Sequence, residues 1–281
     1  MSRRTPIGAS RILKALAIGF LLVLAVFNLV PILWMVSVSL KPDSDIYSLP
    51  VGLLPRSPIL QNYIEVLQDP RMIGFFLNSV IVTVGSTAAC VVLSFLAGYG
   101  FSRHTFRGKR LLLSYFLYST VLPQAIIVVP LYMLLIQLRM HGTYQGLIFA
   151  YLAISLPLGV WLFSLFFETV PIELEQAAQI DGCGTFRLLW KILVPLLAPC
   201  SFAVSIYSFV LAWNEYLLPL IMSSGSMAPL TVGLASYQQE TLIDWGHIMA
   251  AAFLMTIPTA IFFMAFTRHL VSGLSAGAVK G

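Results

Sequence analysis

The chain has 281 residues, of which 59% are hydrophobic and only 10% are charged, and its formal net charge is +5. Soluble domains carry about 25% charged residues, so this chain has too little polar surface to fold as a water-soluble globule. The positive charge does not indicate a nucleic-acid partner, because most basic residues flank apolar stretches, as orientation in a lipid membrane requires. The composition predicts an all-α, polytopic membrane protein.

Seven uncharged stretches are long enough to cross a membrane, since an α-helix needs about 20 residues to span about 30 Å of hydrocarbon. One of them, 216–239, contains Ser223-Ser224-Gly225-Ser226 and Pro229, so we interpret it as the end of one span followed by a loop. The first apolar run is too long for the core of a cleavable signal peptide, so we expect a retained signal anchor. The six transmembrane helices are predicted at residues 14–38, 74–100, 112–134, 145–167, 200–221 and 247–267.

The basic residues orient these helices. If both termini are cytoplasmic, 12 of the 16 Lys and Arg residues lie in the cytoplasm and four lie outside. Positive residues favour the cytoplasmic side of a membrane protein. We therefore expect both termini and the polar segment 168–199 to be cytoplasmic.

The segment 168–199 is predicted to form a helical hairpin. Pro171 suits the first turn of a helix, while Gly182 and Gly184 are typical of residues just past a helix end. Thr185 is positioned to cap a second helix. The hairpin either docks on a partner protein or packs on the membrane and its own helix bundle, and the residue pattern favours neither.

A docking function would use two features of the first helix. The small side chains of Ala177 and Ala178 permit close approach to a partner groove. Glu175 and Asp181 are charges placed to fix the docking register from the rim of that contact.

The hairpin carries a recognisable motif. Residues Glu173-Leu174-Glu175-Gln176-Ala177-Ala178-Gln179-Ile180-Asp181-Gly182 are followed, after nine residues, by Ile192-Leu193-Val194-Pro195. This pattern resembles the "EAA" loop of permease subunits of bacterial ATP-binding-cassette (ABC) importers. The likeness extends to Ser39–Pro42, Ala212–Tyr216 and Gly273–Gly281, which look like the carbohydrate-uptake branch and its six-span maltose-transporter subunits.

The resemblance implies that the hairpin is a coupling helix seated in a cleft of an ATPase subunit. It also implies that the tail 273–281 reaches between two ATPase subunits, although its composition alone predicts a frayed coil. Gln176 stands where the family usually has Glu, which weakens or moves a charged contact. The motif places the coupling contact at Glu175, Gln176, Ala177, Ala178, Asp181 and Gly182.

The resemblance further implies four kinds of partner in a bacterial inner membrane. They are a second homologous permease subunit, two ATP-binding subunits, an extracytoplasmic solute-binding protein and the lipid membrane itself.

The sequence offers no catalytic machinery of its own. It lacks the Gly-x-x-x-x-Gly-Lys-Ser/Thr loop that cradles nucleotide phosphates. Its four histidines are scattered, without Cys or carboxylate at metal-ligand spacing. We therefore expect no cofactor, no metal and no enzymatic activity in this chain, with ATP hydrolysis on partner chains.

Polar residues within the predicted spans are candidates for a translocation path. Glu215 is the only ionisable residue well inside an apolar stretch, and such residues are functional candidates. Asn78, Gln124 and Asn214 either bind a hydroxylated solute or bond neighbouring helices. For Glu215, pairing within the bundle is the competing interpretation.

These features together favour a permease subunit of an ATP-driven importer of a sugar or sugar-like solute, working by alternating access. The alternative is a secondary carrier or channel that acts without ATPase subunits. Such proteins tend to bury several ionisable groups, often in repeated halves, whereas this chain has one candidate and no visible repeat.

Overall fold

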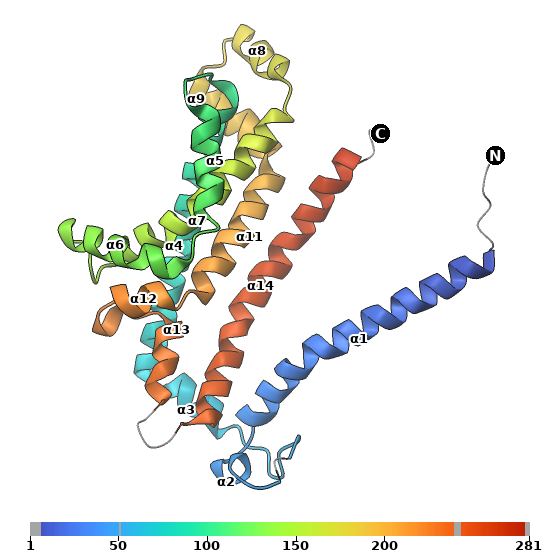
Figure 1. Ribbon diagram of the computed structural model, residues 1–281, viewed down its shortest axis with the longest axis vertical. Helices are drawn as coiled ribbons and strands as arrows, with labels where there is room; N and C mark the ends of the chain where they lie inside the picture. The colour runs from blue at the N-terminus through green and yellow to red at the C-terminus, as the bar shows by residue number, and fades with distance from the viewer. Residues whose placement is uncertain (1–6, 51, 239–242, 279–281) are drawn as a thin grey trace. The chain divides into compact units, whose positions relative to one another are not determined.

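The structure is a computed structural model that describes residues 7–50, 52–238 and 243–278, with side chains described for 13–50, 52–238 and 243–267. Within these residues the chain is helical and has no named strand, which confirms the predicted all-α class (Figure 1). It forms two compact units. The first comprises the described residues within 1–69 and 237–255, and the second comprises those within 70–236 and 256–281.

The first unit is organised around the ends of two long helices. Asn62 is buried and its amide donates to the carbonyls of Ser39 and Lys41 at 2.9 and 3.1 Å, which fixes the turn after the first long helix. Tyr63 packs edge-on against Phe253, with ring centroids 6.2 Å apart. The helices of this unit are α1 (Ile7–Ser39), α2 (Asp43–Ile46), α3 (Gln61–Gln68) and the first part of α14 (Trp245–Ala278).

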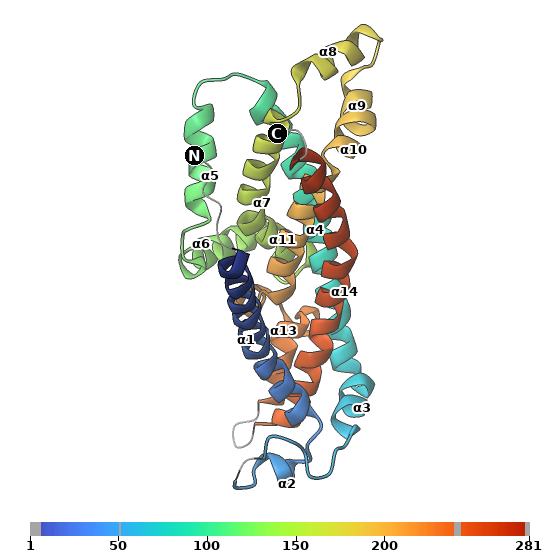
Figure 2. The same cartoon turned by 90° about the vertical axis from the view of Figure 1, so that its right-hand side faces the viewer.

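The second unit contains the remaining helices, and Figures 1 and 2 show α4, α7 and α11 side by side at its centre. The second part of α14 packs on α11, where the rings of Phe262 and Phe209 stack with centroids 3.9 Å apart. The helices are α4 (Pro70–Arg103), α5 (Lys109–Ser119), α6 (Gln124–Gln137), α7 (Tyr144–Glu168), α8 (Ile172–Ile180), α9 (Thr185–Leu188), α10 (Val194–Leu196), α11 (Ala198–Asn214), α12 (Leu217–Met222) and α13 (Leu230–Gly233). Shorter turns are a π-helix at Leu189–Leu193 and 3₁₀ turns at Gly225–Met227 and Leu234–Tyr237.

In the part of the chain that the structure describes, four helices are long and apolar enough to cross a membrane by themselves, and two bent helix pairs bring the number to six if each pair is one crossing. The bent pairs are Lys109–Ser119 with Gln124–Gln137 and Thr185–Leu196 with Ala198–Asn214. The single helices are Leu13–Ser39, Pro70–Arg103, Tyr144–Glu168 and Trp245–Thr267.

The third apolar stretch is broken, where the sequence predicted one helix over 112–134. α5 ends at Ser119, α6 begins at Gln124, and the two axes differ by 107° (Figure 1). Pro123 provides the physical reason. It has no N–H to donate and it disfavours helical geometry in the residue before it.

Two further predictions differ from the structure. The predicted span 200–221 ends early, because α11 stops at Asn214 and a separate helix, α12, begins at Leu217. The tail was expected to be coil, but α14 continues as helix through Ala278, and residues 279–281 lie outside the described part of the chain.

A glycine lets α4 and α7 approach closely. A Cβ on Gly98 would lie 2.5 Å from Cβ of Phe163 and 3.0 Å from two backbone atoms of α7. We expect Gly98→Ala to lower the free energy of unfolding by about 1–3 kcal/mol, the usual cost of overpacking. Gly100→Ala is the matched control on the same helix, since a Cβ there meets nothing within 4 Å. Thermal unfolding of the purified variants in detergent measures both; equal melting temperatures for the two would contradict this packing argument.

Candidate functional site

The polar segment between α7 and α11 folds as a helical hairpin. Pro171 precedes α8 as its N-cap residue, with φ −58°. The turn after α8 contains Gly182 at φ +77°, a left-handed conformation that favours glycine. The predicted capping of the second helix by Thr185 is wrong, because Gly184 is the N-cap residue and no side chain caps it.

The hairpin has an inner face that packs on its own bundle. Ala178 and Leu188 are buried in one hydrophobic cluster with Phe167 of α7 and Cys200 of α11. The hairpin is therefore anchored to the helices that it connects. Packing on its own helix bundle, one of the two possibilities left open by the sequence, is observed for this face.

Its outer face is exposed and partly apolar. Ile180 is 86% exposed and Phe186 is 76% exposed, and the ring of Phe186 lies 6.1 Å from that of Trp190. Large apolar side chains that gather on a surface mark an interaction site. The motif residues that share this exposure are Gln176, Ala177, Asp181 and Gly182.

Glu175 lies on the other face, so its predicted place at the exposed rim is wrong. It is only 4% exposed, and its carboxylate accepts a hydrogen bond at 2.6 Å from Nε of Arg103, the last residue of α4. The Tyr99 hydroxyl donates to its second oxygen at 3.3 Å. Arg103 and Tyr99 were not among the site residues predicted from the sequence. Their spacing of four residues places both on one face of a helix, but nothing in it identifies a partner 72 residues away.

Three of the four predicted path residues come together where two broken helices meet. Glu215 follows α11, is 7% exposed, and accepts hydrogen bonds from the backbone N–H groups of Leu217 and Leu218 at 3.0 and 3.2 Å. Gln124, the first residue of α6, donates to the other carboxylate oxygen at 3.3 Å. Asn214 is exposed beside them, and its amide donates to the Val210 carbonyl within α11.

Asn78 is held elsewhere in the second unit. Its amide donates to the carbonyls of Ser226 and Ala228 at 2.7 and 3.0 Å, and its oxygen accepts from the Tyr144 hydroxyl at 2.6 Å. Next to it, Ser79 accepts from the N–H of Leu230 at 2.7 Å. Asn78 thus ties the 223–230 loop to α4 and has no free polar atom directed at a solute in this arrangement.

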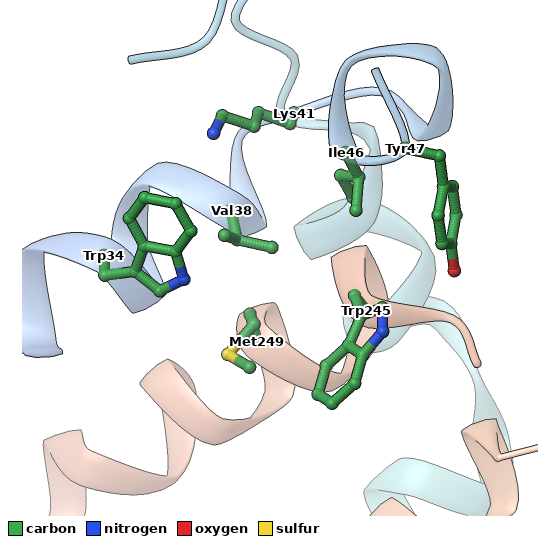
Figure 3. A pocket seen from close by; sticks show the side chains of 7 residues that line it. All are labelled: Trp34, Val38, Lys41, Ile46, Tyr47, Trp245 and Met249. Atoms are coloured by element: carbon green, nitrogen blue, oxygen red, sulfur yellow. The ribbon is translucent and has the colours of Figure 1, made fainter. Parts of the chain in front are cut away.

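The first unit contains an aromatic pocket of about 310 Å³ (Figure 3). Lys41, at its edge, is buried and donates to the Gly52 carbonyl at 2.5 Å, with its ammonium 5.0 Å from the centre of the Trp34 ring. The remaining lining is mainly apolar, so the pocket offers little hydrogen bonding to a hydroxylated solute. Its lining residues are Trp34, Val38, Lys41, Ile46, Tyr47, Trp245 and Met249.

Comparison with known proteins assigns the chain to a family. Residues 90–276 match the model of the binding-protein-dependent transport system inner membrane component. The chain belongs to this family, and it is a membrane permease subunit of an ABC transporter. This confirms the resemblance inferred from the hairpin motif.

Curated relatives cover almost the whole chain. The sulfoquinovosyl glycerol transport system permease protein SmoH of Agrobacterium fabrum is 36% identical over 92% of this chain and 91% of its own length. The trehalose/maltose transport system permease protein MalG of Thermococcus litoralis is 36% identical, covering 95% and 96%. A solved bacterial ABC transporter involved in importing the acidic polysaccharide alginate has the same fold, with a TM-score of 0.80 at 20% identity over 95% of this chain and 99% of that one.

Proposed function

We propose that this chain forms, with a second homologous permease subunit, the translocation path of an ATP-driven importer of a sugar or sugar-like solute. The membership of the family and the sugar-derived solutes in the names of two relatives support this proposal. The observation that carries the coupling part is the exposed apolar face of the hairpin, which needs a protein partner to cover it.

That partner is an ATPase subunit in our proposal. Ile180 and Phe186 flank the turn at Gly182 and are largely exposed, while Ala177 presents a small exposed side chain one helical turn before Ile180. An apolar helix face with few charges seats well in a groove of a soluble protein. Gln176, Ala177, Asp181 and Gly182 are proposed to lie at this contact.

The hairpin and both termini are then cytoplasmic, consistent with the distribution of Lys and Arg. The connections 40–69 and 223–244 lie on the opposite side, where a solute-binding protein would deliver the solute. ATP hydrolysis takes place on the partner chains in this proposal.

The proposed path runs past the break between α11 and α12. Exposed amides of Gln124 and Asn214 supply hydrogen-bond donors and acceptors there, which suits a hydroxylated solute. The Glu215 carboxylate accepts hydrogen bonds from the N–H groups of Leu217 and Leu218 and so stabilises the break between the two helices. Asn78, the fourth predicted path residue, is proposed to act on the loop at 223–230 instead.

Purification of this chain with the products of neighbouring transport genes tests the proposal. We expect a stable complex with a second permease and two nucleotide-binding chains, which takes up a sugar into proteoliposomes only with ATP and a binding protein. Solute uptake by the isolated chain without nucleotide would instead support the alternative, a carrier or channel.

A further inference from the structure

We propose that Arg103 and Glu175 are positioning residues that make the coupling hairpin and α4 move as one body, so that Glu175 acts within this chain and not on the ATPase. The inference rests on the proposed function and names the contacts through which movement of the hairpin would be transmitted to α4. The contacts that carry it are the α4–α8 bridge, formed by Tyr99, Arg103, Val170 and Glu175.

The bridge crosses the turn where the hairpin could pivot. α7 ends at Glu168 and α8 begins at Ile172, so a short linker separates the two helices. Arg103 contacts both this linker and the helix that follows it. Its Nη2 donates to the carbonyl of Val170, in the linker, at 2.8 Å, and its Nε donates to Glu175, in α8, at 2.6 Å.

Arginine is the residue that this geometry requires. A planar guanidinium presents several donors in fixed directions, whereas a lysine ammonium is a single point on a flexible stem. The bridge is also shielded from water, because the side chain of Arg103 is 11% exposed and that of Glu175 is 5% exposed. Ion pairs screened from solvent hold their geometry more strongly than exposed pairs.

The covalent chain connects the hairpin to α7 and α11 but not to α4, whose Phe95 shares only the buried apolar cluster of Ala178 and Leu188. Covalent continuity joins α8 to α7, and α9 and α10 lead into α11. The α4–α8 bridge adds α4, whose Gly98 already packs tightly on Phe163 of α7. Force applied to the exposed face of the hairpin therefore reaches α4 and α7 together, and the linker at 169–171 does not absorb it.

The first experiment separates positioning from simple stability. Glu175→Gln and Arg103→Gln are reconstituted with the complete transporter, and solute transported per ATP hydrolysed is measured. We expect assembly and ATP turnover to persist while this ratio falls at least tenfold. Arg103→Lys should fall as well, and Tyr99→Phe, which loses only the 3.3 Å contact, by about twofold. Glu173→Gln, an exposed carboxylate on the same helix, is the matched control and should keep the wild-type ratio.

The second experiment replaces the bridge with a covalent link. Arg103→Cys and Glu175→Cys are combined in a chain whose Cys90, Cys183 and Cys200 are changed to Ala, since all three are free. We expect a low transport-to-ATP ratio that recovers when a short bifunctional thiol reagent joins the two positions. A link that blocks transport would overturn the inference, because α8 would then have to move relative to α4.

The outcomes separate this inference from the function on which it rests. Wild-type complexes without solute-stimulated ATP hydrolysis would refute the proposed function. Active wild-type complexes with Glu175→Gln matching Glu173→Gln would refute only the bridge. Loss of ATPase binding in Glu175→Gln would also overturn it, since the bridge would then serve to build the hairpin and not to transmit force.

Discussion

Gly182→Val is expected to reduce ATP-driven solute uptake at least tenfold. Gly182 adopts φ +77° in the turn between α8 and α9. A side chain in this left-handed region costs about 1–2 kcal/mol, and a β-branched one is a steric outlier. Because 1.4 kcal/mol corresponds to a factor of ten in an equilibrium, the turn should shift to another conformation. Ile180 and Phe186 would then no longer present one exposed surface. Uptake into proteoliposomes and solute-stimulated ATP hydrolysis measure the effect.

Two matched variants isolate the backbone conformation as the cause. Gly184 has φ −69° and open space at its Cβ position, so Gly184→Val should retain most uptake. Gly182→Asn should also retain most uptake, since asparagine tolerates the left-handed region. If Gly182→Val transported as well as Gly184→Val, the shape of this turn would not matter for coupling.

The long helices could be predicted because length and absence of charge are local properties of the chain. The break at 120–123 was not predicted, since Val121 and Leu122 are as apolar as a continuing helix and only Pro123 signals a change. A proline in a membrane helix is compatible with a mild kink, and the sequence does not distinguish this from the observed 107° bend.

The face of the hairpin that packs on the bundle could not be predicted from the sequence for a different reason. Helical periodicity places Glu175 and Ala178 on one face, but it does not say whether that face meets the bundle or a partner. The answer depends on Arg103, at the end of an apolar stretch, where a basic residue is sufficiently explained as an orienting charge. The contact between Arg103 and Glu175, 72 residues apart, determines which face packs on the bundle, and one sequence alone does not reveal such a contact.

Glu215→Leu is expected to destabilise the permease strongly. The carboxylate accepts hydrogen bonds from the N–H groups of Leu217 and Leu218 and lies 7% exposed. An apolar side chain leaves these donors unsatisfied, at about 1–3 kcal/mol for each buried group. Gln124 would lose its contact with Glu215 as well. We expect a lower melting temperature and less folded permease in membranes, measured by thermal unfolding and by size-exclusion chromatography in detergent.

Glu215→Gln distinguishes the two interpretations of this residue, because its amide oxygen still accepts both backbone hydrogen bonds while its charge is gone. If Glu215 shapes the helix break, Glu215→Gln should keep near wild-type stability and solute uptake within about twofold. Its three charge-assisted hydrogen bonds become neutral ones, and the exposed Gln124 amide can turn its oxygen toward the new NH2 group. Normal stability with uptake lost would show that the charge itself serves transport.

Asn214→Ala is the comparison at the neighbouring position. The exposed Asn214 amide donates to the Val210 carbonyl within α11. Its removal should therefore leave stability unchanged and raise the solute concentration needed for half-maximal uptake.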